Sequence, residues 1–201
     1  DRFELVAVCD VDADKAHALA ATLGVPVVCR DFAALCALPD LDVIDICTPS
    51  FLHFEQTLAA LAAGKHVILE KPAAGSLREV DALMAAEAQT GRRVLPIFQY
   101  RFGAGLQKLR HLVRQGIAGQ PYVATSETHW RRKGAYYAAW RGRWVHELGG
   151  PIVTLAVHAH DVLYSVLGPA RRVYAALATR VNPIETEDCV AATLEMACGA
   201  L

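Results

Sequence analysis

The chain has 201 residues, of which 54% are hydrophobic and 20% are charged, and its formal net charge is -1. This composition excludes a disordered chain, which is poor in apolar residues and highly charged. The near-neutral charge gives no electrostatic basis for binding nucleic acid or an anionic membrane. The six cysteines form no C-x-x-C pair and most lie in apolar runs, so we expect small buried thiols in a reducing cytoplasm.

The first hundred residues alternate short strand-like runs with amphipathic helices. Strands are expected at 4–10, 25–29, 42–50, 66–70 and 93–101, and helices at 12–24, 31–38, 53–65 and 76–91. Asp12 and Asp31 are expected N-caps, and Ser76 with Glu79 forms a capping box. Apolar strands that alternate with helices predict a doubly wound parallel sheet of the Rossmann type, buried on both faces.

The pattern changes near residue 100, so we expect one domain at 1–100 and a second at 101–201. In the second half we expect a helix near 104–115, a β-rich run at 120–130, a buried helix at 151–167, and strands at 171–181 and 188–199. Polar residues interrupt the apolar run 151–167, which therefore does not predict a membrane span. These elements predict a partial α+β domain with an open, mostly antiparallel sheet.

Both ends of the sequence look cut. Residue 1 stands almost directly on a strand, and the last strand runs out at "EMACGAL", where a hairpin is expected to turn. A sheet left with an open edge is a liability for a folded protein. We therefore expect a fragment, or a chain trimmed to its ordered part.

The stretch "VAVCDVD" is typical of the second strand of a dinucleotide-binding half, in which the acid after the strand accepts hydrogen bonds from the adenosine ribose. Asp10 is the candidate, and its charge favours NAD over NADP. The alternative is that Asp10 or Asp12 only caps the next helix. The Gly-rich phosphate loop is expected about 20 residues before the acid, and the chain begins nine residues before it. The similar Gly103-Ala-Gly105 lacks the third glycine and follows the last parallel strand, so we discount it.

Several motifs occur together in a characteristic order. They are "VAVCDVD", "VIDICTPSFLHFEQTLAALAAGKHVILEKPAAGS", "WRGRW" and "GGPIVTLAVHAHD". Their order and spacing resemble the Gfo/Idh/MocA family of oxidoreductases over nearly the whole chain. The resemblance implies a Rossmann domain followed by an α/β domain whose large open sheet commonly pairs between subunits. It thus implies a homo-oligomer of the full-length protein.

The resemblance also assigns roles to individual residues. Asp10 resembles the ribose-binding acid, and Thr48, Pro49 and His53 match a loop that lies along the cofactor. Glu70 and Lys71 match residues beside the nicotinamide ring and the substrate. The remaining matches are Arg101, which follows the last parallel strand as an arginine often does in the family, and His158, the substrate-domain histidine. No metal site is predicted.

The sequence departs from the family at two positions. The first glycine of the family's G-G-G pattern is Leu148 here, and the aspartate four residues before the histidine is Thr154. Threonine donates or accepts a hydrogen bond but does not act as a base at neutral pH. This departure puts a complete Lys-Asp-His constellation in doubt, while Lys71 and His158 remain.

Lys71 is the strongest candidate for chemistry. Oxidation of an alcohol needs a hydride acceptor and a base for the hydroxyl proton. Burial beside a cofactor ring disfavours the ammonium form of a lysine, which prepares it to accept that proton. Pro72 restricts Lys71 to extended conformations at the carboxyl end of a parallel strand, where such folds place ligands. The alternative is a solvated lysine after a strand.

His158 and Thr154 are spaced by four residues and are expected to share one helix face. With Asp161 three residues further on, they form a polar face on an apolar helix, where we expect a substrate partner. The alternative is a core histidine that is satisfied by a backbone group.

The loop 131–144 carries five basic and four aromatic residues. A nucleic-acid patch is improbable at this net charge, although bases stack on aromatic rings. We expect a wall of the substrate pocket, with Tyr137, Trp140 and Arg141 as contacts, and subunit packing is the alternative.

The first hypothesis is an NAD(P)-dependent oxidoreductase acting on a secondary alcohol of a sugar, inositol or related polyol, with Lys71 and His158 as its catalytic residues. The second is a non-catalytic sensor or regulator of the same fold. The third is a relative that keeps NAD bound and uses transient oxidation in glycoside cleavage.

Overall fold

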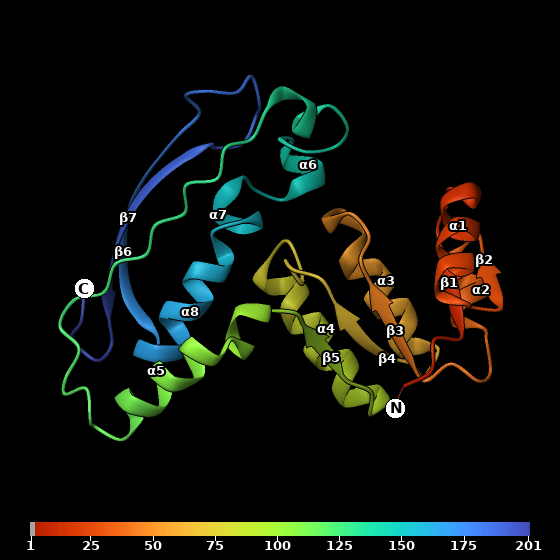
Figure 1. Cartoon of the computed structure of the whole chain (residues 1–201), viewed down its shortest axis with the longest axis horizontal. Helices are drawn as coiled ribbons and strands as arrows, with labels where there is room; N and C mark the ends of the chain where they lie inside the picture. The colour runs from red at the N-terminus through yellow and green to blue at the C-terminus, as the bar shows by residue number, and fades with distance from the viewer. Residues whose placement is uncertain (1–2) are drawn as a thin grey trace. The chain divides into compact units, whose positions relative to one another are not determined.

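A computed structural model describes residues 3–201, which divide into two compact units. One unit contains the chain up to Thr48 together with Leu52–Pro96, and the other contains Pro49–Phe51 together with Ile97–Leu201. Each unit has its own strands and helices (Figure 1).

The first unit contains five short parallel strands. They are β1 (Ala7–Cys9), β2 (Val27–Cys29), β3 (Val43–Ile46), β4 (His66–Leu69) and β5 (Val94–Pro96). β1 pairs with β2, and a second sheet has the order β3-β4-β5. The predicted parallel arrangement is confirmed, although the described strands form two sheets instead of one.

Three helices of this unit begin directly after their predicted capping residues, and two of them end at the predicted glycines Gly24 and Gly91. They are α1 (Ala13–Leu23), α2 (Phe32–Cys36), α3 (His53–Ala62) and α4 (Leu77–Thr90), and the short 3-10 helix η1 (Ser50–Leu52) precedes α3. Asp12 accepts from the Lys15 amide and Asp31 from the Ala34 amide at 2.7 Å. Ser76 Oγ accepts from the Glu79 amide, while the Glu79 carboxylate accepts from the Gly75 amide at 2.7 Å. These side chains satisfy amides that a helix leaves unpaired.

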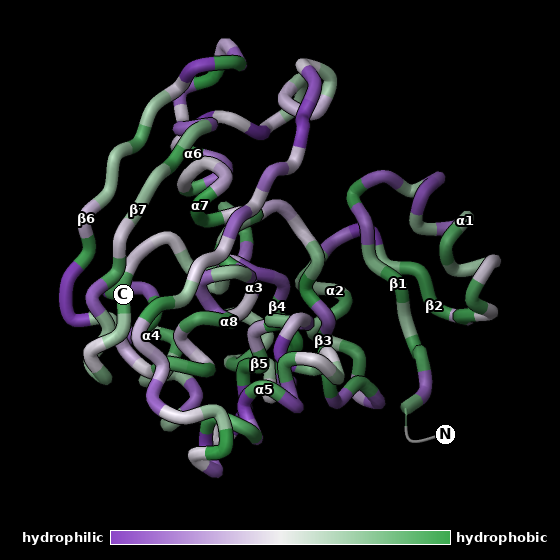
Figure 2. The backbone as a smooth tube through the Cα atoms, turned by 60° about the vertical axis from the view of Figure 1, so that its left-hand side comes forward, coloured by the Kyte–Doolittle hydropathy of each residue, from purple (hydrophilic) through white to green (hydrophobic). Residues whose placement is uncertain are grey.

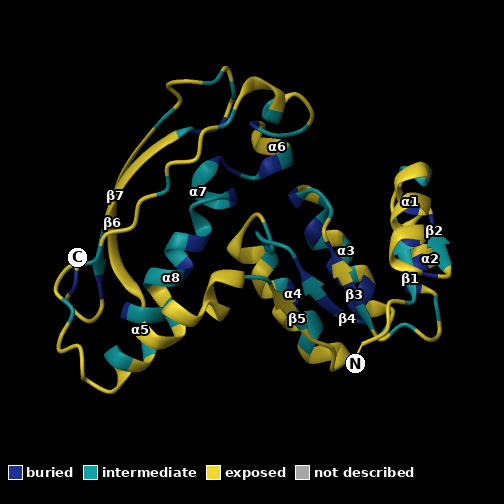
Figure 3. Ribbon diagram, viewed as in Figure 1, coloured by how far each residue is buried: buried dark blue, intermediate teal, exposed yellow. Residues whose placement is uncertain are grey.

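A single apolar core holds both parallel sheets of the first unit. Ile46, Val67 and Leu69 are each at most 2% exposed, and β3 and β4 are largely buried in Figure 3. Residues of β2, α2 and α3 pack into the same cluster. One face of β3 and β4 is therefore buried, whereas the other is only partly covered and Asp45 is exposed, so the predicted burial on both faces is not seen in these strands. Figure 2 shows that β1 and β2 are also hydrophobic.

The second unit consists mainly of helices and one hairpin. Its elements are the 3-10 helices η2 (Gln99–Phe102) and η3 (Gly134–Tyr137), the helices α5 (Ala104–Arg114), α6 (Trp144–Glu147), α7 (Pro151–Thr154) and α8 (Val157–Leu167), and the strands β6 (Ala170–Ala178) and β7 (Cys189–Met196). Leu167 of α8, Met196 of β7 and Ala200 form its small buried cluster. The α+β character predicted for the second half is confirmed.

Two strand predictions are wrong in part. The run 93–101 keeps only Val94–Pro96 as a strand, because the chain then turns into η2. The β-rich run 120–130 is not a strand. Its backbone pairs at one point only with a segment distant in sequence: the Ala124 amide donates to Leu201 O, and the Leu201 amide donates to Tyr122 O. A strand forms only where its backbone has a neighbouring strand to hydrogen-bond with, and an alternating pattern of side chains does not ensure that such a neighbour exists.

The helix predicted at 151–167 is divided into α7 and α8. The Ala156 amide donates to Pro151 O over five residues, and Leu155 leaves helical geometry with φ of -122° and ψ of -59°. Among residues 3–201 no single helix is long and apolar enough to span a membrane. One pair of helical segments, Trp144–Thr154 and Val157–Leu167, is long and apolar enough when the two are taken together. The pair is bent by 49° between them, and only its length and composition suggest a span.

The strands β6 and β7 form an antiparallel hairpin, as the sequence predicts. Every residue of β6 except Ala178 is exposed, and the hairpin is mostly yellow in Figure 3. All six cysteines are free thiols. The expectation that most are buried is wrong, because Cys189 and Cys198 belong to this open region and Cys47 is exposed just after β3.

Candidate functional site

Lys71 lies directly after β4, in a loop that continues the pairing of the parallel sheet. The Glu70 amide donates to Ile46 O at 3.0 Å, and the Glu70 carboxylate accepts from the Lys71 amide at 3.2 Å. The Lys71–Pro72 peptide is cis. Lys71 is half-buried, whereas Pro72 is buried. The lysine is therefore held at the carboxyl end of a parallel strand, the edge at which open α/β sheets bind ligands.

His53 connects this loop to the loop after β3. It is 1% exposed, with Nδ1 at 2.7 Å from Pro72 O and Nε2 at 2.8 Å from Thr48 O. Thr48 Oγ1 in turn donates to Gln56 Oε1 at 2.6 Å. The structure thus brings Thr48, His53 and Lys71 together as the sequence predicts, but the His53 ring is used inside the protein. Pro49 follows Thr48 and precedes η1.

Asp10 lies just after β1 and is exposed. One oxygen of its carboxylate accepts from the Asp12 amide at 2.8 Å. Asp12, not Asp10, is the N-cap of α1, and its contact with Lys15 at 2.9 Å lowers the pKa of the Asp12 carboxyl. Asp12 therefore caps the helix, whereas Asp10 does not. The exposed Asp10 carboxylate lies at the end of the strand, where folds of this kind bind a ribose.

Thr154 and His158 lie on opposite sides of the break between α7 and α8. Both are buried, at 8% and 5% exposed. Because the helix is interrupted, the argument that a spacing of four residues puts them on one helix face does not apply. The Thr154 hydroxyl donates to Gly150 O at 3.0 Å. The His158 ring is stacked on Tyr100, with centroids 4.9 Å apart and planes inclined by 28°.

The basic and aromatic loop forms a stack of alternating rings and guanidinium groups. The Arg141 guanidinium lies 4.4 Å from the Trp140 centroid and 4.5 Å from that of Tyr136. The Arg132 guanidinium also lies over Tyr136, and over Trp130 as well. Such cation–π contacts fix the loop. Trp140 and Arg141 therefore pack mainly against each other and their neighbours.

Tyr137 lines a cavity of about 320 Å³ within the second unit. Burial raises the pKa of the Tyr137 hydroxyl. Polar groups of the β6–β7 loop, Asn182 and Asp188, line the same cavity together with Trp130 and Arg132. Of the three loop residues predicted to contact substrate, Tyr137 is the one that borders this cavity.

Two buried carboxylates, which sequence analysis missed, hold the segment before α7. Glu147 is 2% exposed and accepts from the Gly142 amide at 2.5 Å. Glu187 is 5% exposed and accepts from the Gly150 amide at 3.0 Å and the Ile152 amide at 3.2 Å. Glu187 thereby caps α7 from a position 37 residues away along the chain. Local sequence patterns carry no signal for such a contact.

The glycine pattern of this segment has a physical explanation. A Cβ on Gly150 would lie 2.1 Å from Glu187 O, so this position requires glycine. Leu148, which stands where the family pattern has its first glycine, has a φ of 66°. That left-handed conformation is unfavourable for a leucine. The departure at Leu148 is therefore accommodated at the cost of backbone strain.

Asp188 closes the loop between β6 and β7. Its carboxylate accepts from the amides of Arg180, Val181 and Asn182 at 2.7, 2.9 and 2.8 Å. Burial alone would raise the pKa of Asp188, but these hydrogen bonds outweigh it and lower the pKa to about 2. The carboxylate thus stabilises the loop in its ionised form.

Replacement of Asp188 by asparagine is expected to destabilise the protein at neutral pH. The pKa falls from 3.8 to about 2 on folding, so the stabilisation is complete above pH ~4 and is lost as the pH falls through about 2. We expect a loss of about 1–2 kcal/mol at pH 7, allowing for solvent screening. Thermal unfolding of Asp188→Asn and wild type from pH 7 to pH 3 checks this. A difference that stays constant over this range contradicts it, and exposed Asp81→Asn is the control.

The comparisons with known proteins agree with this geometry. Residues 1–98 match the model of the oxidoreductase family with an NAD-binding Rossmann fold, and residues 106–201 match the GFO/IDH/MocA C-terminal domain. The chain is 36% identical over 167 residues to D-glucoside 3-dehydrogenase of Escherichia coli K12, covering 82% of this chain and 47% of that protein.

Two solved structures show the same similarity in three dimensions. The WlbA dehydrogenase from Bordetella pertussis, in complex with NADH and UDP-GlcNAcA, has a TM-score of 0.91 and 34% identity over 98% of this chain and 61% of its own. Levoglucosan dehydrogenase, in complex with NADH and levoglucosan, has a TM-score of 0.87 and 25% identity over 98% of this chain and 55% of its own.

The chain spans about half the length of the curated relatives it matches. The two family models cover almost all of it in the order found along the chain. The parallel strands of the first half agree with the Rossmann fold of the first model. The chain therefore belongs to the GFO/IDH/MocA family of oxidoreductases, and its first half is the NAD-binding Rossmann domain of that family.

Proposed function

We propose that the protein containing this chain is an NAD-dependent dehydrogenase that interconverts a secondary alcohol and a ketone of a sugar, inositol or related polyol. The observation that carries the proposal is Lys71, a half-buried lysine directly after β4 at the carboxyl end of the parallel sheet. Relatives with recorded activities include a D-glucoside 3-dehydrogenase and an inositol 2-dehydrogenase. They support an alcohol of a cyclic polyol as the substrate class.

In the proposed reaction the nicotinamide supplies the hydride acceptor. Lys71 accepts the proton of the substrate hydroxyl at Nζ during oxidation and returns it to the carbonyl oxygen during reduction. The loop that carries Lys71 is fixed at two points, by the Glu70 amide on Ile46 O and by His53 against Pro72 O. This fixation keeps the lysine within reach of one substrate atom, which is what general acid–base catalysis requires.

His158 is proposed to bind the substrate hydroxyl, and Thr154 to shape its surroundings. The Tyr100 ring against the imidazole limits the orientations available to His158. Thr154 donates its hydroxyl hydrogen to Gly150 O, so it is not the base. Proton transfer is therefore assigned to Lys71, and Tyr137 is retained as a substrate contact because it borders a cavity.

The residues at the end of β1 fit NAD. Asp10 is exposed and α1 already has Asp12 as its cap, so the Asp10 carboxylate is available to accept from the two ribose hydroxyls. A 2′-phosphate at this position would meet a like charge, so NADP is the weaker cofactor. Glu70 and Thr48 are proposed to line the cofactor on the strand-end side of the first unit, and Pro49, the next residue along the chain, is proposed as a further cofactor contact.

Replacement of Asp10 by serine in the full-length protein is expected to weaken NAD(H) binding about 10–100-fold, because hydrogen bonds to a charged acceptor are lost. NADP(H) binding is expected to weaken less or to improve. Titration of both cofactors by fluorescence measures the change. Asp14→Asn, also exposed in the first turn of α1, is the control. An unchanged NAD(H) affinity contradicts the ribose role.

The proposed function is tested by assaying the full-length protein with NAD and with NADP against a panel of aldoses, glycosides, inositols and sugar acids. Reduction of NAD by at least one cyclic polyol, with the ketone identified in the products, is the expected result. Cofactor binding without turnover on any member of the panel contradicts it.

Thr154 favours a second candidate, a non-catalytic NAD(H)-binding sensor or regulator. The family's usual acid is absent there, and the threonine hydroxyl is occupied by Gly150 O. This candidate predicts cofactor binding with a change in another property, such as partner binding or assembly. A relative that keeps NAD bound and cleaves glycosides through transient oxidation would instead form product without accumulating NADH.

A further inference from the structure

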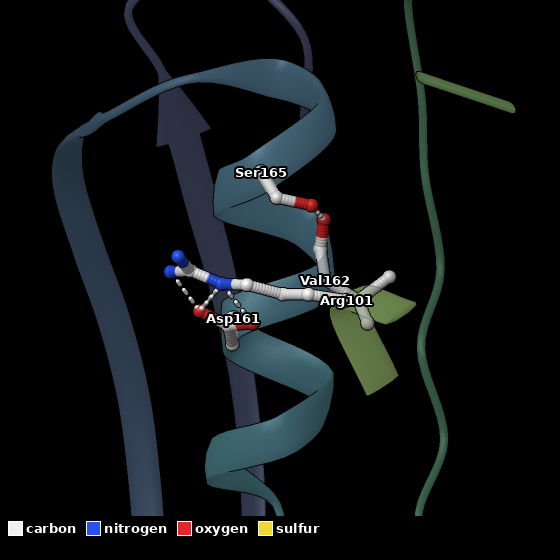
Figure 4. A network of polar contacts seen from close by, with 4 residues as sticks. All are labelled: Arg101, Asp161, Val162 and Ser165. Atoms are coloured by element: carbon white, nitrogen blue, oxygen red, sulfur yellow. Dashed lines mark hydrogen bonds and ion pairs between the residues drawn. The ribbon is translucent and has the colours of Figure 1, made fainter. Parts of the chain in front are cut away.

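An ion pair between Arg101 and Asp161 joins η2 to α8 (Figure 4). Arg101 Nε donates to both carboxylate oxygens, at 2.9 and 2.8 Å, and Nη2 donates to Oδ1 as well. The Asp161 side chain is only 6% exposed, whereas that of Arg101 is 44% exposed. Paired donation of this kind fixes direction as well as distance, because the guanidinium is planar and rigid. The aspartate side of this pair is buried within the second unit.

The residues next to Arg101 contact the histidine one turn away from Asp161. The Tyr100 ring is stacked on His158, and Phe98 meets the same imidazole edge-on with centroids 6.4 Å apart. The Arg101 guanidinium also lies over Phe98, 5.3 Å from its centroid. The short segment at η2 therefore contacts α8 through both an ion pair and two aromatic rings.

His158 and Asp161 are spaced by three residues within α8, so their side chains lie on neighbouring positions of one helix face. Tyr100 and Arg101 are consecutive in η2. Two adjacent residues of one element thus contact two neighbouring side chains of the other. A shift of the η2 backbone relative to α8 would therefore displace both the Arg101 guanidinium and the Tyr100 ring.

Two of the three guanidinium nitrogens of Arg101 are engaged by Asp161. Both Nε and Nη2 donate to Asp161, and the group is also packed on Phe98. A buried carboxylate needs such a partner, because an uncompensated charge in this position is strongly unfavourable. This use differs from the cofactor contact that the sequence led us to expect for Arg101.

We propose that Arg101 and Asp161 are a positioning pair, which holds the Tyr100 ring against His158 and thereby sets the orientation of the imidazole toward the substrate hydroxyl. The proposal rests on the proposed function of His158. It gives Arg101 no contact with the cofactor or the reacting atoms.

The test uses the full-length protein with three variants: Arg101→Met, Asp161→Asn and the two combined. The measured quantities are kcat and KM for the active polyol, the dissociation constant of NADH, and the NMR shift of the His158 ring protons, which the Tyr100 ring current displaces. Arg172→Met is the matched control, because Arg172 pairs with Glu195 at 3.4 Å on the exposed hairpin.

We expect Arg101→Met to lower kcat/KM for the polyol by about 10²-fold, as a small misplacement of a reacting group does. NADH affinity is expected to stay within about 2-fold, which is a small free-energy change. The His158 shift is expected to move toward that of an unstacked ring. The double variant should recover part of the lost kcat/KM and part of the His158 shift, because it no longer buries an unpaired charge. The Arg172→Met protein should behave like wild type.

Two results overturn the proposal. One is a His158 shift that is unchanged in Arg101→Met, since the stacking then does not depend on the pair. The other is a loss of NADH affinity that the double variant does not restore, since Arg101 then contacts the cofactor. If Arg101→Met does not fold, Arg101→Lys, which keeps the charge but not the paired donation, is measured in the same way.

The failure of the proposed function is distinguishable from the failure of this proposal. A wild-type protein that binds NADH but turns over no polyol contradicts the dehydrogenase assignment. The NMR measurement on Arg101→Met still decides whether the pair positions His158, because it depends on no turnover.

Discussion

Full-length protein with Lys71→Ala is expected to lose turnover by about 10²–10⁴-fold, the range of a general acid–base residue. NADH binding is expected to remain, because the strand-end loop is fixed by contacts that do not use the lysine side chain. The Glu70 amide reaches Ile46 O, and the His53 ring reaches Pro72 O. Steady-state kinetics and cofactor titration on the same preparation measure both quantities.

A second substitution at this position separates proton transfer from charge. Lys71→Arg keeps the positive charge but does not release a proton near neutral pH. It is therefore expected to be nearly as inactive as Lys71→Ala. Lys108→Ala, an exposed residue of α5, is the control. If Lys71→Ala turns over substrate at the wild-type kcat, the lysine is not the proton-transfer residue.

Gly150→Ala is expected to produce the largest loss of stability among single methyl additions to the second unit. The new Cβ would lie 2.1 Å from the Glu187 carbonyl oxygen and 2.6 Å from the Glu187 Cδ. The first of these atoms belongs to the backbone, so no side-chain rotation relieves the clash. Relief of the clash requires the Glu187 backbone to move away from Gly150, and this movement would break the hydrogen bonds by which Glu187 caps α7.

We expect the free energy of unfolding to fall by about 3–5 kcal/mol, from overpacking together with a buried carboxylate that loses its donors. This corresponds to a Tm lower by roughly 10 °C, measured by scanning calorimetry or circular dichroism. Gly105→Ala is the matched control, because a Cβ there meets nothing within 4 Å. A Gly150→Ala protein as stable as this control would show that the backbone near Glu187 adapts easily.

Local patterns predicted most of the first unit. Asp12, Asp31 and the Ser76–Glu79 box mark helix starts because they act within three residues of chain. Continuous apolar runs identify the parallel strands. The boundaries were less accurate: β1 has three residues where seven were expected, because hydrogen-bonded partners, not apolar residues, determine where a strand ends.

The second unit depends more on contacts that are distant in sequence. Arg101 meets Asp161 across 60 residues and Gly150 meets Glu187 across 37. No periodicity connects such pairs. The division of 151–167 into two helices also depends on one amide, that of Ala156 on Pro151 O, which composition does not indicate.

In the candidate site, too, local patterns predict some features, whereas others depend on contacts that are distant in sequence. Lys71 and His158 are predicted from the family resemblance. Taken alone, the strand before Lys71 also allows a solvated lysine, and the apolar helix around His158 also allows a core histidine. His53 is predicted to belong to a loop along the cofactor, and the structure adds that its ring lies between Thr48 O and Pro72 O. A buried imidazole and a cofactor contact have the same appearance in a sequence, and only the positions of the carbonyl groups distinguish them.

The exposed hairpin of β6 and β7 determines how a sample of these 201 residues will behave at the bench. Val173, Tyr174 and Leu177 are 53–60% exposed on β6, and among the described strands β6 pairs only with β7. Ribbons of this kind associate edge to edge. We therefore expect the chain alone to associate as its concentration rises, which light scattering would detect. Arginine or a mild detergent in the buffer should increase the yield of monomer for binding measurements.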